Sequence, residues 1–220
     1  AAPVAPARDE SGGGDGSSGG RTRKRALLAV AGLAVAALLV GGGLLLTGAW
    51  GGTDAYKLTT PRTVGGDYQR DGKGETGDGA AFGDSEVPGM KATADVSADY
   101  RNATARLNLG GAYGQVKDPD TALTWLMEKS GDNLADTGAE PKGVTREFSP
   151  SRFDGDILTC QEYTISSVPL ALCGWGDGST VGLVSYVPLE AGGASADGLD
   201  LEKTAELTAR VREDARTEAD

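Results

Sequence analysis

The sequence predicts an α+β protein with one transmembrane helix and a two-layer extracytoplasmic domain, built from an antiparallel sheet and two helices. Three observations support this prediction. Residues 26–50 contain no charged residue. Beyond residue 90, alternating apolar and polar residues separated by turn sequences predict hairpins. Two segments, 118–131 and 201–215, have the spacing of amphipathic helices. The order of these elements is typical of a two-layer α+β domain.

The uncharged segment, ALLAVAGLAVAALLVGGGLLLTGAW, predicts the transmembrane helix. At ~1.5 Å per residue it would extend about 37 Å, which is enough to cross a hydrocarbon core of ~30 Å. A cleaved signal peptide is the alternative, but its apolar core is usually only about 7–15 residues long. We therefore expect a retained single-pass anchor with the lipid bilayer as its partner.

Charges at the two ends of this segment predict its orientation. Basic residues stay on the cytoplasmic side, and four of them directly precede the segment: Arg21, Arg23, Lys24 and Arg25. The next basic residue is Lys57, and Trp50 is placed as an aromatic anchor at the outer interface. We expect a cell-membrane protein with a cytoplasmic N-terminus and an extracellular C-terminal domain.

Composition predicts four parts of the chain, with the following expected structures. Residues 1–25 form a Gly/Ser/Pro-rich, disordered cytoplasmic tail that ends in the basic cluster. Residues 26–50 form the transmembrane helix, and residues 51–89 form a Gly/Asp-rich linker. Within the linker, Tyr56–Tyr68 has enough apolar residues to dock on a domain. Residues 90–218 form the extracytoplasmic α+β domain.

The charge of the outer part excludes one class of partner. Residues 1–50 hold five basic and three acidic residues of the chain's 21 and 32, so the remainder has a net charge of −13. Affinity for nucleic acid comes mainly from Lys and Arg that neutralise phosphates. We therefore expect no nucleic-acid partner.

The domain begins with a predicted hairpin and a helix. Met90–Val116 forms two strands with a turn at Arg101-Asn102. Asp118 is a good N-cap, Pro119 fits the first helical position and Gly131 is expected to end the helix. Trp125 lies off the centre of the apolar stripe, at the edge of the core, where it packs against the linker or faces a pocket.

The two cysteines lie in a predicted three-stranded meander. A turn at Ser166-Ser167 places Cys160 opposite Cys173, and Asp177-Gly178 predicts a two-residue turn with Gly176 opposite Ser179. Opposed Cα atoms are ~4.5–5.5 Å apart, within reach of a disulfide. We predict a structural disulfide, which fits an oxidising compartment. A redox-active pair is the alternative, but the C-x-x-C spacing is absent.

The same register assigns side chains to two faces of the meander. The more apolar face is expected to receive the helices: Ile157, Tyr163, Ile165, Leu170, Leu172, Val181, Leu183 and Val187. The mixed face is expected to be covered by Tyr56–Tyr68 or to be partly open: Leu158, Cys160, Glu162, Ala171, Cys173, Trp175, Val184 and Tyr186. A final amphipathic helix from about Leu201 to Ala215 should pack on the sheet.

Most catalytic residue sets are missing from the sequence. The chain has no histidine, so Ser-His-Asp triads, Cys-His dyads and histidine-ligated metals are excluded. We expect no cofactor, no metal and no catalytic residue. Carboxylates are plentiful, and nothing in the sequence brings two particular ones together: Asp118, Asp120, Asp154, Asp156, Glu162 and Asp177.

Three segments resemble a known group of proteins. YKLTTPRTV, GAYGQVKDPDTAL and CGWGDGSTVGLVSY are similar to those of single-pass membrane-anchored extracytoplasmic proteins of high-GC actinobacteria with no assigned activity. The similarity covers residues 21–190. It implies a basic stub, one membrane helix and an outer domain with one disulfide, and it implies no ligand or catalytic residue.

These observations lead to three hypotheses about function. The first is a non-enzymatic, membrane-tethered domain that binds or senses an envelope protein or a cell-wall ligand. The second is a carboxylate-dependent cell-envelope hydrolase, which requires two facing acids in a pocket. The third is an accessory subunit of a membrane complex, which requires an exposed apolar patch on the Trp175 face.

Overall fold

The computed structural model describes residues 56–83, 85–189 and 198–219. The predicted transmembrane segment 26–50 and cytoplasmic tail lie outside these residues, as do the predicted topology residues Arg21, Arg23, Lys24, Arg25 and Trp50. Neither helix of the described residues is long and apolar enough to cross a membrane.

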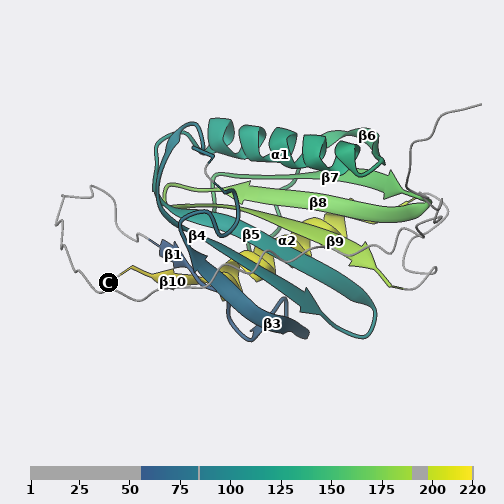
Figure 1. The fold of residues 1–220 in the computed structure, drawn as a ribbon, viewed down its shortest axis with the longest axis horizontal. Coiled ribbons are helices and arrows are strands. Elements are labelled where there is room, and N and C mark those ends of the chain that lie inside the picture. The colour runs from purple at the N-terminus through teal and green to yellow at the C-terminus, as the bar shows by residue number, and fades with distance from the viewer. Residues whose placement is uncertain (1–55, 84, 190–197, 220) are drawn as a thin grey trace, which may run out of the picture. The chain divides into compact units, whose positions relative to one another are not determined.

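An antiparallel sheet of eight strands forms the centre of the described domain, in the order β2-β3-β4-β5-β9-β8-β7-β6 (Figure 1). Its strands are β2 (Thr63–Val64), β3 (Tyr68–Gly77), β4 (Met90–Arg101), β5 (Ala105–Val116), β6 (Ala139–Glu147), β7 (Ile157–Ile165), β8 (Val168–Gly176) and β9 (Thr180–Pro188). A separate ladder joins β1 (Tyr56–Leu58) to β10 (Arg216–Glu218). The helices are α1 (Pro119–Asp136) and α2 (Leu201–Ala215). The predicted α+β class with two helices is confirmed for this domain.

The expectation of two layers is wrong, because the helices pack on opposite faces of the sheet (Figure 1). We call the first face the α1 face; it packs against α1 through Tyr163, Leu170, Leu172 and Leu183. The other is the α2 face; it packs against α2 through Leu158, Cys160, Ala171 and Cys173. The α2 face appeared mixed in sequence, but its small residues and disulfide present a smooth apolar strip on which a helix can pack closely.

Residues 56–77 are not a linker. They form β1, β2 and β3, and they bury Leu58, Val64 and Tyr68 at 1%, 0% and 7% exposure. These side chains share a core with Trp175 and Val211 on the α2 face. The expected docking of Tyr56–Tyr68 is thus observed, and the polar β3 that follows was missed because its side chains are mostly exposed and give no apolar alternation.

The first turn of the meander has the predicted register. Ile165 pairs with Val168, and the φ angles of Ser166 and Ser167 are +50° and +69°, as a type I′ turn requires. The second turn differs, because Gly176 pairs with Val181 rather than Ser179. A shift of two residues leaves every side chain on its predicted face.

The shift of the second turn has a local cause. The Asp177 carboxylate accepts hydrogen bonds from the backbone N–H groups of Ser179 and Thr180, at 2.9 and 2.7 Å. Together with the hydrogen bond from the Asp177 N–H to the Thr180 carbonyl at 2.9 Å, these bonds hold a turn centred on Gly178-Ser179, and Gly178 does not adopt the positive φ that a type I′ turn would need.

Helix α1 begins as expected and ends later than expected. The Asp118 side chain accepts a hydrogen bond from the Thr121 N–H at 3.0 Å, which confirms the N-cap. Gly131 does not end the helix. A Cβ there would lie 2.8 Å from the Tyr163 hydroxyl oxygen, so the glycine admits this side chain from β7.

Candidate functional site

The disulfide is the predicted feature that the structure confirms most directly. Cys160 pairs with Cys173 across β7 and β8, and both residues are 0% exposed under α2. Among the described residues no cysteine is free. A bond covered on this face by a helix is shielded from reductants and thiols, so its role is structural rather than catalytic.

A charge cluster, buried at Arg212 and Asp177 and exposed at Asp154, ties α2 to the sheet. Arg212, 2% exposed, donates from Nε and Nη2 to Asp177 Oδ2 at 3.0 and 2.8 Å. Arg212 also donates to Asp154, which in turn accepts a hydrogen bond from Arg216 at 2.7 Å. Burial alone would raise the pKa of Asp177, but the Thr180 hydroxyl and the Arg212 charge outweigh it and lower that pKa. All four charged groups are engaged with each other, so the cluster is a structural clamp.

A groove of about 410 Å³ lies beside α1, between this helix and the loop that joins β3 to β4. We call it the neutral groove, because among residues 56–83, 85–189 and 198–219 no acidic residue lines it. Its floor is formed by β4, β5, β8 and β9, one wall by α1 and the other by the loop between β3 and β4. The lining residues are Ala81, Phe82, Ser85, Ser97, Asn108, Gly110, Trp125, Leu126, Lys129, Ser130, Asn133, Leu134, Leu172, Leu183 and Ser185. Its size is within the range of small-molecule sites.

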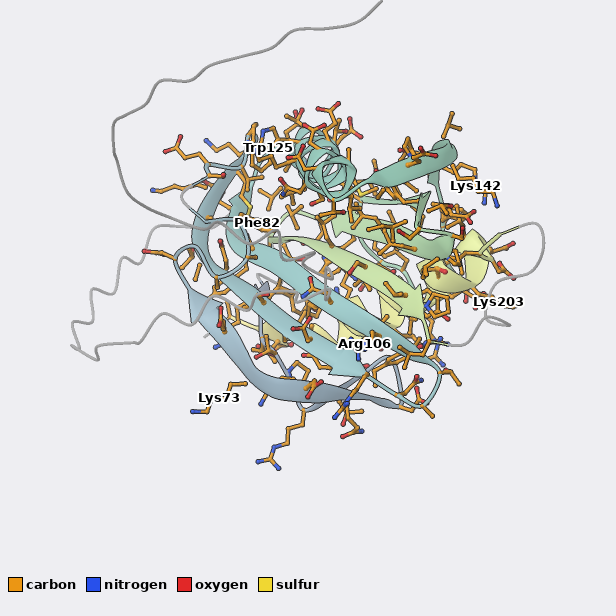
Figure 2. The ribbon with its side chains drawn as sticks, turned by 45° about the vertical axis from the view of Figure 1, so that its right-hand side comes forward. Lys73, Phe82, Arg106, Trp125, Lys142 and Lys203 are labelled. Atoms are coloured by element: carbon orange, nitrogen blue, oxygen red, sulfur yellow. A yellow bond between two sulfur atoms is a disulfide. The ribbon has the colours of Figure 1, made fainter. Side chains whose placement is uncertain are left out.

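The loop wall is held in place by one buried acid. The Phe82 N–H donates to Asp95 Oδ2 at 3.4 Å, and Asp95 is 8% exposed on the α1 face of β4. Burial raises the pKa of Asp95, although the N–H groups of Phe82 and Ala81 oppose the rise. Asp95 thereby positions Phe82 at the groove. Figure 2 shows Phe82 and Trp125 on the same side of the sheet, in the loop and on the helix.

A second groove, of about 640 Å³, lies on the other side of α1 against β6 and β7. We call it the acidic groove, because Asp120, Glu128, Asp132 and Glu147 line it together with Arg146. Within residues 56–83, 85–189 and 198–219, no group of three or more His, Cys, Asp or Glu is placed to hold a metal ion.

The structure assigns the remaining sequence candidates as follows. Trp125 is half-buried and faces the neutral groove, in agreement with the prediction of an edge or pocket position. Trp175 is 0% exposed, so its own side chain does not contribute to the exposed apolar patch that the subunit hypothesis requires. The neutral groove itself was missed, because its loop wall lies in residues expected to be a linker.

These features define a class of protein: an α+β domain with one structural disulfide, helices on both faces of an antiparallel sheet and a ligand-sized groove beside the first helix. Comparison with protein-family models, curated proteins and solved structures finds no match to this chain.

Proposed function

We propose that the protein is a membrane-tethered extracytoplasmic binding domain, without enzymatic activity, whose ligand occupies the neutral groove. The observation that carries the proposal is the groove, which combines the apolar side chains of Leu172 and Leu183 with neutral hydrogen-bonding side chains. Such linings hold a ligand by shape and hydrogen bonds.

The extracytoplasmic location rests on separate support. The disulfide is typical of proteins in oxidising compartments. The uncharged segment 26–50 and the basic residues before it favour the same side of the membrane for everything downstream. These two lines of support are independent, because one depends on sulfur chemistry and the other on charge distribution.

Labelling of lysines in intact cells tests the location. A membrane-impermeant amine reagent should modify the exposed Lys73 and Lys203 (Figure 2), whereas Lys24 should react only after lysis. A Lys73→Arg variant serves as the control for peptide assignment by mass spectrometry. Labelling of Lys24 alone in intact cells would place the domain inside and overturn the proposal.

The acidic groove supports a second candidate, a carboxylate-dependent hydrolase. Four carboxylates line this groove, and glycoside hydrolysis needs two of them at a suitable separation. Reducing ends released from a polysaccharide by the full chain would be the assay. Turnover that a Glu147→Gln variant abolishes would favour the hydrolase over the binding domain, and absence of turnover would leave the binding domain preferred.

A further inference from the structure

The neutral groove contains an unusual set of uncommitted polar side chains. Asn108 Nδ2 donates to Asp99 Oδ1 at 2.9 Å, which leaves its amide oxygen available. The other polar neutral side chains of the groove make no hydrogen bond to any described residue: Ser85, Ser97, Ser130, Asn133 and Ser185. Hydroxyl and amide groups both donate and accept, so this lining complements a ligand that carries many hydroxyl groups.

Aromatic rings complete the walls above this lining. Phe82 and Trp125 are both half-buried and line the groove from the loop and from α1. The negative face of an aromatic ring attracts groups with positive edges, and the C–H face of a sugar ring is such a group. Rings on the walls and hydroxyls and amides around them are the combination that sugar recognition requires.

The charge of the groove indicates the sign of the ligand. Of the described residues that line the groove, Lys129 is the one that carries a charge, and it forms no ion pair with another described residue. The whole chain has a net charge of −11, yet no Asp or Glu of the described residues lines this groove. An exposed lysine in such surroundings favours a carboxylate at its end of the site.

From these observations we infer that the neutral groove binds an acidic oligosaccharide, with its sugar rings between Phe82 and Trp125 and a carboxylate at Lys129. This inference rests on the proposed binding function and specifies its ligand class. An acyl chain fits less well, because it would bury the serine hydroxyls without partners. An added peptide strand also fits less well, because the floor strands are interior strands of the sheet and offer no free edge.

Titration calorimetry of the full chain in lipid nanodiscs tests the inference, with tetragalacturonate as the acidic probe and tetra-N-acetylglucosamine as the neutral one. We expect the acidic probe to bind with a Kd of about 1 mM or tighter. Trp125→Ala should weaken it about 30-fold or more, as truncation of an aromatic anchor does. Lys129→Gln should weaken the acidic probe about 2- to 5-fold and leave the neutral probe unchanged.

Two further variants test the same groove in case Trp125→Ala does not fold. Asn133 is exposed on α1, so Asn133→Ala removes a hydrogen-bonding group without cost to the helix. A Cβ at Gly110 would meet only the Ala81 Cβ, at 3.6 Å, so Gly110→Val fills the groove floor without a backbone clash. Both should lower affinity at unchanged thermal stability, whereas Asp132→Asn, on the acidic-groove side of α1, should bind like the wild type.

The outcomes separate this inference from the function on which it rests. Failure of both oligosaccharides to bind overturns the inference, and so does binding that Gly110→Val and Asn133→Ala leave unchanged. If laurate or a peptide library binds instead and Gly110→Val abolishes that binding, the ligand class is wrong and the binding function stands. Labelling of Lys24 alone in intact cells, as described above, would instead overturn the proposed function itself.

Discussion

Replacing Arg212 with methionine should destabilise the domain strongly, because it leaves Asp177 as an unpaired buried carboxylate. Arg212 is 2% exposed and donates two hydrogen bonds to Asp177 Oδ2. Loss of one partner of a buried ion pair costs about 3–5 kcal/mol. Asp177 keeps its bonds from Ser179 and Thr180, so we expect a loss near the lower end, about 3 kcal/mol.

Urea unfolding of the full chain, followed by tryptophan fluorescence, measures this loss. Trp175 is a suitable reporter, because its Nε1 donates to the Thr180 hydroxyl at 3.1 Å, directly beside the cluster. Arg210→Met, an exposed substitution on the same helix, is the matched control and should change stability by less than ~0.5 kcal/mol. The expected fall in Tm for Arg212→Met is about 6–12 °C.

A double-mutant cycle decides whether the pair itself is responsible. Arg212→Met combined with Asp177→Asn removes both charges, so part of the loss should be recovered, with a coupling of ~1.5 kcal/mol or more. A loss below ~1 kcal/mol for Arg212→Met, or a coupling near zero, would refute the reasoning that a desolvated ion pair joins α2 to the sheet.

Three further predictions concern the same domain. Replacing Cys160 and Cys173 with alanine should lower the free energy of unfolding by ~3 kcal/mol, the value expected for a loop of this length, and dithiothreitol should then have no further effect on the urea midpoint. Asp118→Ala should cost ~1 kcal/mol through loss of the bond to Thr121, while Asp118→Asn should cost much less, as thermal unfolding will show. The pKa of Asp177 is lower in the folded protein than its unfolded value of ~3.9, so the ionised carboxylate stabilises the fold at pH values above ~3.9. This stabilisation is lost as the pH falls toward the folded pKa. Below pH 4, the urea midpoint of Asp177→Asn should therefore fall less steeply with pH than that of the wild type.

The elements predicted correctly are those whose signal is local. The α1 N-cap at Asp118, the turn at Ser166-Ser167 and the pairing of Cys160 with Cys173 each depend on a few adjacent residues. Periodicity assigned the faces of β7, β8 and β9 correctly, and an error of two residues in the second turn did no harm because side chains alternate with a period of two.

The missed features depend on contacts between distant residues. Gly131 was expected to end α1, but the space it provides is used by Tyr163, 32 positions further along the chain. Strand β3 has exposed polar side chains and is recognisable only through its ladder with β4. The neutral groove requires Phe82, held by Asp95, to face Trp125, and no spacing rule links these three positions.

The short ladder between β1 and β10 closes the domain on itself. Tyr56 is paired with Glu218 and Arg216 stacks 4.5 Å from the centre of the Tyr56 ring, so the chain enters and leaves this domain at one point. Loss of β10 from the ladder would therefore release β1 as well, and it would uncover Leu58, now 1% exposed. A pulling force applied to the chain before Tyr56 would therefore act first on the β1–β10 ladder and only then on the eight-stranded sheet.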